Sequence, residues 1–242
     1  MAEFEYKIKD EEVCITKYVG SSKEVVIPEK IEGFPVTSVG EYAFSNNKLT
    51  CIDLTGVKSI GYGAFYNNKL TSIDLSGVTS IGNSAFKDNK LTSVDLTGVK
   101  SIGSYTFYNN ELISVDLSGV KSIGNCVFYN NKLTSVDLSG VTNIGNSAFW
   151  DNNLEAIILP EKFRARTKEI FDFDEEELDN RNKKYVKKYV DKMQELYMKK
   201  LYKNSRKYGL IFEYIIYYTY RESYDGMLEE AIKNIDCSIV CF

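Results

Sequence analysis

The sequence repeats the run Leu70-Thr71-Ser72-Ile73-Asp74-Leu75-Ser76-Gly77-Val78 as Leu91-Thr92-Ser93-Val94-Asp95-Leu96-Thr97-Gly98-Val99, with a period of 21 residues. Six such units follow one another in phase between Val36 and Pro160. Self-similarity at a fixed period in the twenties is typical of a solenoid, in which each unit forms one turn of a coil. We therefore expect stacked repeats.

Each unit carries more apolar residues than it can bury alone, so neighbouring units must stack and share one core. Within residues 57–77, the inward candidates are Val57, Ile60, Ala64, Phe65, Leu70, Ile73 and Leu75. The end of this set alternates like a half-buried strand and stops at the turn Ser76-Gly77. The pattern predicts that these strands stack into a parallel sheet along one wall.

Two further positions recur in every unit. A Phe fills the first, and an Asn follows it three residues later. We expect a buried aromatic spine and a buried Asn ladder, because an amide side chain can satisfy both donors and acceptors where the coil turns. The alternative for the Asn residues is an exposed turn position. The members are Phe44, Phe65, Phe86, Phe107, Phe128 and Phe149, with Asn47, Asn68, Asn89, Asn110, Asn131 and Asn152.

A family resemblance rests on these residues. The run Ile60-Gly61-x-x-Ala64-Phe65, followed by Leu70-Thr71-Ser72-Ile73, resembles the BspA-like class of leucine-rich repeats. The lead-in Val25-Val26-Ile27-Pro28 and Gly33-x-Pro35-Val36 is similar to the N-terminal start of that family. The resemblance implies a curved binding scaffold, in many members a secreted or surface-attached adhesin. The period is slightly shorter here, and Leu-Ser-Gly or Leu-Thr-Gly mostly replaces the family's Leu-Pro.

The predicted fold class is an α/β solenoid with a parallel β-sheet wall, and the chain divides into three parts. Residues 1–35 form an N-terminal β cap over the open end of the first repeat, residues 36–160 form six leucine-rich repeats, and residues 161–242 form an α-helical C-terminal module. Ile158 stands in the sixth unit where the others have Asp, which predicts that the following chain covers this end. The segment 181–207 is rich in Lys and Arg and has apolar residues at helical spacing, as in an amphipathic helix.

The strand pattern also predicts a row of carboxylates. The residue between the last two apolar positions points away from the core, and stacked strands lie about 4.8 Å apart. The row comprises Asp53, Asp74, Asp95, Asp116 and Asp137, beside the outward hydroxyls of Ser72, Ser93, Ser114 and Ser135. Opposed like charges destabilise a sheet. Either the row binds a basic segment or cations, or duplication copied a solubilising Asp.

Lysines form the other periodic surfaces. On the C-terminal helix, Lys184, Lys188 and Lys192 have three interpretations: a solvated face, a site for an acidic protein, acidic membrane or nucleic acid, or an internal ligand for the Asp row. Lysines at Lys48, Lys69, Lys90 and Lys132 are expected on other edges of the coil, where they keep it soluble. Nucleic acid is disfavoured, because we expect neither exposed aromatics among the lysines nor an overall basic face.

Composition argues against an enzyme. The 242 residues have a net charge of -4 and contain no His, and we find neither a nucleophile motif nor a phosphate loop. We predict a non-enzymatic scaffold, without cofactor or metal, that binds a protein partner through the concave Asp/Ser/Thr face and the basic C-terminal helix. The alternative is a surface adhesin or secreted effector that binds host proteins.

The location follows from the absence of export signals. No stretch reaches the roughly 18 apolar residues that a membrane span needs. The start Met1-Ala2-Glu3-Phe4-Glu5-Tyr6 is charged where a secretory signal needs an apolar core. We expect a cytoplasmic protein, with a secreted or cell-surface location as the alternative. Apolar residues after Gly209 could also join two copies through the C-terminal module.

Overall fold

The computed structural model describes residues 3–201. The expected apolar segment after Gly209 and the rest of the predicted helical module therefore lie outside the described residues. The chain forms two compact units, Met1–Val186 and Lys187–Phe242. The first unit contains the cap, the repeats and the first residues of the long helix, so its boundary lies beyond the end of the repeats.

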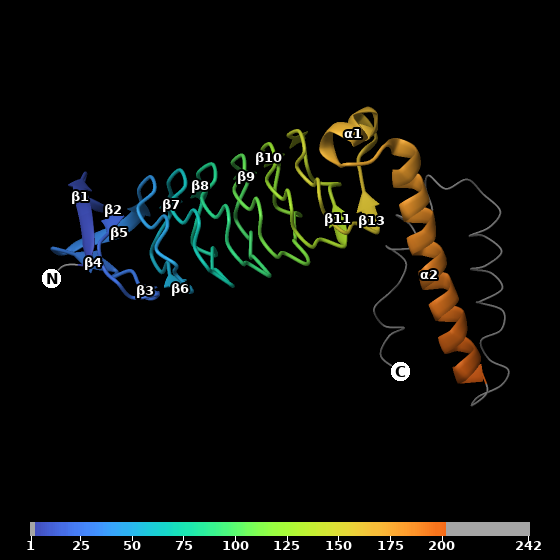
Figure 1. Cartoon of the computed structure of the whole chain (residues 1–242), viewed down its shortest axis with the longest axis horizontal. Coiled ribbons are helices and arrows are strands. Elements are labelled where there is room, and N and C mark those ends of the chain that lie inside the picture. Colours follow the sequence, from blue (N-terminus) through green and yellow to red (C-terminus); the bar gives the residue numbers. More distant parts are fainter. Residues whose placement is uncertain (1–2, 202–242) are drawn as a thin grey trace. The chain divides into compact units, whose positions relative to one another are not determined.

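A hairpin of β1 (Phe4–Lys9) and β2 (Glu12–Tyr18) covers the first coil. Strand β2 pairs in parallel with β5 (Phe34–Val39), and β5 also pairs with β4 (Lys30–Ile31) in the antiparallel sense. These strands continue directly into the coil, as Figure 1 shows. The edge of the first repeat is thus hydrogen-bonded by the cap, which prevents it from pairing with another chain.

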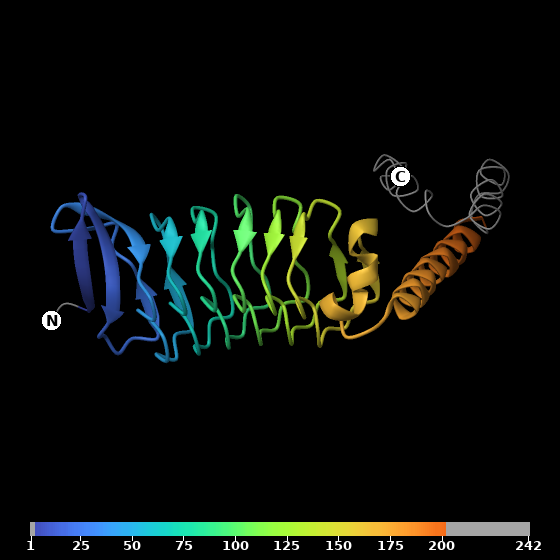
Figure 2. The same ribbon diagram turned by 90° about the horizontal axis from the view of Figure 1, so that it is seen from above.

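Short parallel strands line one wall of the coil, one for each repeat (Figure 2). Each is a Ser-Ile or Asn-Ile pair, and Ser59 of one repeat pairs with Ser80 of the next. The first two extend the cap sheet in the order β1-β2-β5-β7-β8, and the other three form a second sheet in the order β9-β10-β12. The strands are β7 (Ser59–Ile60), β8 (Ser80–Ile81), β9 (Ser101–Ile102), β10 (Ser122–Ile123) and β12 (Asn143–Ile144). We call this the Ser-Ile wall.

Parallel sheets along the coil are confirmed, but their position differs from the prediction. The predicted wall carries strands only at its ends, where β3 (Glu24–Val26) pairs with β6 (Cys51–Asp53) and β11 (Ser135–Asp137) pairs with β13 (Ala156–Ile158). In the repeats between them, the corresponding residues 72–75, 93–96 and 114–117 are not in strands.

Hydrogen bonds join neighbouring coils on both walls. On the predicted wall, the N–H of Ile113 reaches the carbonyl of Thr92 at 3.3 Å, and the N–H of Thr134 reaches that of Ile113 at 3.4 Å. On the Ser-Ile wall, the N–H of Gly82 reaches the carbonyl of Ile60 at 2.8 Å. Shorter bonds also precede the expected strands, as between the N–H of Lys90 and the carbonyl of Leu70 at 3.0 Å, and the Ser-Ile wall has a bond of 3.2 Å at Ser80. The two walls therefore differ in which residues form a strand ladder and not in a uniform spacing of the coils. A repeat period shows which positions align but not which of them form a strand ladder.

The Phe spine forms the centre of the core, as predicted. All six rings are buried, and neighbouring ring centroids lie 5.2 to 5.8 Å apart with nearly parallel planes. Both ends of the spine continue into the caps. Tyr18 stacks on Phe44 at 5.4 Å, and Phe171 stacks on Phe149 at 5.6 Å. The caps thus extend the repeat core instead of forming cores of their own.

The Asn ladder is confirmed as a structural element from Asn68 to Asn152, whereas Asn47 is half-buried and its Nδ2 donates to Ser45 of its own turn. Asn68, Asn89, Asn110 and Asn131 are buried. From Asn68 to Asn152, each Nδ2 donates to the carbonyl of the spine Phe in the preceding repeat at 2.8 to 3.0 Å. Each Oδ1 accepts the N–H of a Leu in that repeat at 2.9 to 3.1 Å. Every side chain therefore joins two coils.

Helical segments cover the last coil. They are η1 (Glu161–Arg166), α1 (Thr167–Ile170) and α2 (Glu175–Leu201). Asn182 of α2 pairs with the edge of β13, because it accepts the N–H of Ile157 and donates to its carbonyl, both at 2.9 Å. Arg164 bonds to Glu175 and Asp179 at 2.8 Å. The following chain covers this end, as the loss of Asp in the sixth unit predicted.

Candidate binding surface

The Asp row is present and exposed. In each of its five repeats, Asp Oδ1 accepts the backbone N–H of the residue two positions later at 2.8 to 2.9 Å. The acceptor therefore shapes the turn at the Ser-Gly or Thr-Gly corner, which is the ordinary role of an Asx turn. The recurring Asp thus has a structural function in every repeat, one that the sequence analysis did not foresee.

These turns also favour the charged form of the carboxylates. The hydroxyl of Thr55 donates to Asp53 at 2.7 Å, and this bond together with the N–H of Thr55 lowers the pKa of Asp53. The hydroxyl and N–H of Thr97 lower the pKa of Asp95 in the same way. For Asp116, the N–H and hydroxyl of Ser118 lower the pKa, and the charge of Asp95 partly opposes the effect. At these three positions the hydrogen bonds therefore favour the ionised carboxylate.

The row has no counter-ion among the described residues. None of its five aspartates belongs to an ion pair there. Ser72, Ser93, Ser114 and Ser135 lie exposed beside it, as predicted from alternation. In β11, exposed Ser135 and Asp137 flank buried Val136. The structure therefore brings the predicted carboxylates and hydroxyls onto one face, which we call the Asp face.

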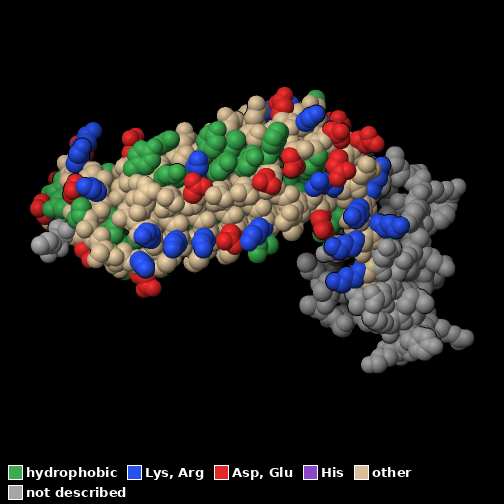
Figure 3. All heavy atoms as spheres, viewed as in Figure 1, with side chains coloured by type: hydrophobic (Ala, Val, Ile, Leu, Met, Phe, Trp, Pro, Cys, Tyr) green, Lys and Arg blue, Asp and Glu red, His purple; other side chains and the backbone are tan. Residues whose placement is uncertain are grey.

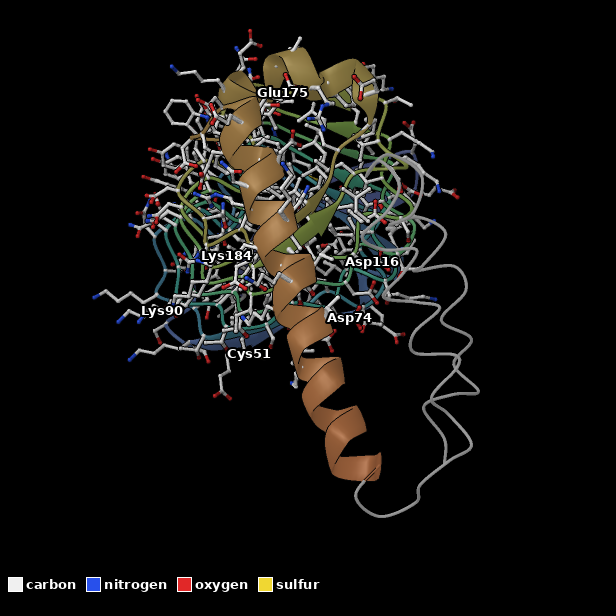
Figure 4. The ribbon with its side chains drawn as sticks, turned by 90° about the vertical axis from the view of Figure 1, so that its right-hand side faces the viewer. Cys51, Asp74, Lys90, Asp116, Glu175 and Lys184 are labelled. Atoms are coloured by element: carbon white, nitrogen blue, oxygen red, sulfur yellow. The ribbon has the colours of Figure 1, made fainter. Side chains whose placement is uncertain are left out.

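A basic edge lies across the coil from the Asp row. In Figure 4, Lys90 points outward on one side, whereas Asp74 and Asp116 lie toward the other. The repeat places lysines at the equivalent positions Lys48, Lys69 and Lys132, all of which are exposed. The fourth repeat has Glu111 at this position, and its carboxylate binds Lys132 Nζ at 2.7 Å. The two charge types are thus separated across one coil.

The predicted helix lysines are exposed on α2. Lys184, Lys188 and Lys192 follow one another at intervals of four, so they share one helix face. Lys184 belongs to the first unit, whereas Lys188 and Lys192 belong to the second. No ion pair in the described part of the chain joins Lys184 to the Asp row. Docking of this helix onto the Asp face stays a prediction.

A row of exposed and half-buried aromatic side chains is a feature that the sequence analysis missed. Figure 3 shows hydrophobic side chains gathered along one edge of the coil. Tyr42 and Tyr62 pack edge to face at 5.2 Å, and Tyr108 stacks on Tyr129 at 4.9 Å. The row, which we call the aromatic edge, comprises Tyr42, Tyr62, Tyr66, Tyr105, Tyr108, Tyr129 and Trp150.

The sequence contained a signal for this edge. The residue directly after the spine Phe is Tyr66, Tyr108, Tyr129 or Trp150 in four of the repeats. Neighbouring coils hold these residues in register, since the N–H of Asn109 binds the carbonyl of Tyr129 at 2.9 Å. A residue next to a buried Phe must point elsewhere, so this column could have been recognised as a second aromatic surface.

The described residues contain no group of three His, Cys, Asp or Glu side chains that could hold a metal ion. No helix within residues 3–201 is long and apolar enough to cross a bilayer.

Comparison with known proteins agrees with the fold. The sequence matches the family described as BspA type leucine-rich repeat region, in six copies, over residues 17–119 and 100–180. No curated protein matches the chain. A leucine-rich cell surface protein from Faecalibacterium prausnitzii is 24% identical, with a TM-score of 0.48, and the match covers 64% of this chain and 54% of that one.

A leucine-rich repeat protein from Bacteroides ovatus is 25% identical, with a TM-score of 0.43, over 67% of this chain and 41% of that one. The chain thus spans about half the length of these solved relatives. The family match covers more than half of the chain and includes the spine, the ladder and both walls. The chain therefore belongs to the BspA-type leucine-rich repeat family.

Proposed function

We propose that this chain is a non-enzymatic binding protein that recognises a basic segment of a protein partner through the Asp face. Its family consists in general of non-enzymatic scaffolds, which supports a binding role. The observation that carries the choice of face is the row of exposed carboxylates held in fixed register by the turn hydrogen bonds. Fixed charges bind at a smaller entropic cost than mobile ones.

Charge favours a basic partner. The pKa values of Asp53, Asp95 and Asp116 are lowered by hydrogen bonds, so these groups are ionised at neutral pH. Complementary charge chiefly increases the association rate and gives specificity. Exposed ion pairs are screened by salt, so affinity should fall as ionic strength rises. The helix lysines Lys184, Lys188 and Lys192 are proposed as a second contact, for an acidic part of the same partner.

The second candidate is a surface adhesin or secreted effector, which the family resemblance favours over the cytoplasmic location. The two candidates share the same face and differ in where the partner is met. Fractionation of the native cells with an antibody to the chain separates them: signal at the cell surface or in the medium supports an adhesin or effector, and signal confined to the cytoplasm contradicts it.

The deciding experiment removes charge and keeps the turns. A triple variant Asp74→Asn, Asp95→Asn, Asp116→Asn preserves the Asx-turn acceptor and removes three charges. The control variant, Glu29→Ser, Glu41→Ser, Glu176→Ser, removes the same number of exposed charges elsewhere. Each protein is used to capture partners from native lysate and from the cell exterior at two salt concentrations.

A partner that binds the original chain and the control, but not the Asn variant, supports the Asp face. Binding that the Asn variant retains at low and high salt contradicts the proposal and moves the site away from this face. Equal melting temperatures of the three proteins show that the loss does not come from unfolding.

A further inference from the structure

The aromatic edge is well suited to a ligand, because its rings are exposed or half-buried and recur along neighbouring repeats, with Lys87 in their place in the third. Tyr42, Tyr62 and Tyr105 are 50%, 43% and 40% exposed. Tyr108, Tyr129 and Trp150 are half-buried and stack in succession, with ring centroids 4.9 and 6.5 Å apart. Isolated exposed aromatics need no explanation, whereas two groups of rings on one edge, with Lys87 between them, indicate an interaction site.

A row of polar side chains runs beside the rings. One residue further along each repeat stand Asn46, Asn67, Asp88, Asn109, Asn130 and Asp151, all with positive φ between 52° and 60°. Asn and Asp tolerate this left-handed conformation better than most residues. Their side chains bond along the row: Asn109 donates to Asp88 at 2.7 Å, and Asn130 donates to Asn109 at 2.8 Å. Each amide keeps a second N–H for a ligand.

The charges on this edge argue against ionic ligands. Its cation, Lys87, already lies over the rings of Tyr66, Tyr105 and Tyr108, at 5.8, 5.8 and 4.8 Å from their centroids. A cationic peptide would have to compete with this internal contact. Single-stranded nucleic acid needs several basic groups along its backbone. Here the one lysine is accompanied by the acidic Asp88 and Asp151.

We propose that the aromatic edge binds a neutral polysaccharide chain. A sugar ring has an apolar C–H face, which packs on an aromatic face, and a rim of hydroxyls that donate and accept hydrogen bonds. The edge offers both features side by side in successive repeats. A polymer meets several equivalent subsites at once, so weak contacts add up through multivalency. The Asp face takes no part in this binding, which therefore stands apart from the proposed protein recognition.

The chain contains its own reporter for the test. Trp150 is the single tryptophan and belongs to the edge. The whole chain is titrated with mixed-linkage β-glucan, glucomannan, xylan and dextran, with heparin as the charged comparison. We expect at least one neutral polysaccharide to change Trp150 emission, protect it from acrylamide quenching and slow migration of the protein in a native gel containing that polysaccharide.

Substitutions locate the site. Tyr108→Ala with Tyr129→Ala removes two stacked rings and should weaken binding about tenfold. Tyr42→Ala with Tyr62→Ala removes two more exposed rings at the N-terminal end of the edge. This second variant tests the same prediction if the first pair of substitutions unfolds the chain. Tyr6→Ala is the control, because Tyr6 is a tyrosine on β1 of the cap, outside the edge.

Three results would overturn the inference. The first is that no neutral polysaccharide of the panel binds, or that heparin alone does. The second is binding that both pairs of variants retain at full strength. The third is a dimer of the original chain that dissociates in the Tyr variants, because a second copy would then occupy the edge. The Asn variant of the Asp face should bind the polysaccharide normally, so failure of either proposal is distinguishable from failure of the other.

Discussion

Replacing Asn110 by Ala tests the energetic role of the Asn ladder. The side chain of Asn110 is buried, accepts the N–H of Leu91 at 3.0 Å and donates to the carbonyl of Phe86 at 3.0 Å. Alanine leaves the buried N–H of Leu91 without this acceptor, whereas the Phe86 carbonyl keeps its bond from Asn89 Nδ2 at 3.1 Å. A buried polar group without a partner destabilises by about 1 to 3 kcal/mol. One such group, the Leu91 N–H, predicts a loss of about 1 to 3 kcal/mol of unfolding free energy.

The matched control is Asn83→Ala. Asn83 is exposed, and its Oδ1 also accepts a backbone N–H of the next coil, that of Ser104 at 2.9 Å. Water can replace this exposed acceptor, so the control should lose about 1 kcal/mol or less. The two variants therefore remove the same kind of bond at a buried and at an exposed position.

Urea unfolding followed by far-UV circular dichroism measures both losses, provided that the slope m is unchanged. Because repeats contact only their neighbours, the damage should also be local. Hydrogen exchange of the Leu91 amide should accelerate strongly in Asn110→Ala, whereas amides in the β1–β2 hairpin keep their protection. If Asn110→Ala were no less stable than Asn83→Ala, or if the Leu91 amide kept its protection, the ladder would not be a stabilising element.

Two further predictions concern the turns and the coil spacing. Hydrogen bonds lower the folded-state pKa of Asp53, Asp95 and Asp116. Their contribution to the unfolding free energy is therefore present above the unfolded pKa of about 3.9 and is lost as the pH falls through the lower folded pKa. Thermal unfolding between pH 6 and pH 2 should therefore show a smaller acid-side loss for a separate variant, Asp53→Asn, Asp95→Asn, Asp116→Asn, than for the original chain. Gly82→Ala should destabilise by about 1 to 3 kcal/mol, since its Cβ would lie 2.7 Å from backbone of the preceding coil. Gly77→Ala, with 3.8 Å of room, should be tolerated, and equal melting temperatures for the two Ala variants would contradict the predicted coil spacing.

The sequence by itself determined the repeat core. A strict period places equivalent residues of neighbouring coils in contact, so a Phe at one position of every unit has to stack and an Asn three residues later has to meet the same backbone groups each time. The spine, the ladder, the exposed Asp row and the family could therefore be predicted from residue positions alone. The same reasoning indicated a covered last coil, because Ile158 breaks the outward pattern.

Only the tertiary structure decided the remaining features. The period does not state which residues of neighbouring coils form a strand ladder, so it could not show that strands form on the Ser-Ile wall while residues 72–75, 93–96 and 114–117 on the other wall are not in strands. It also does not state the backbone conformation at the corners. There the aspartates fold back onto the chain as turn acceptors, and residues beside a buried Phe turn outward into the aromatic edge. Both outcomes depend on how one coil is placed against the next, which is a property of the assembled solenoid and not of any single repeat.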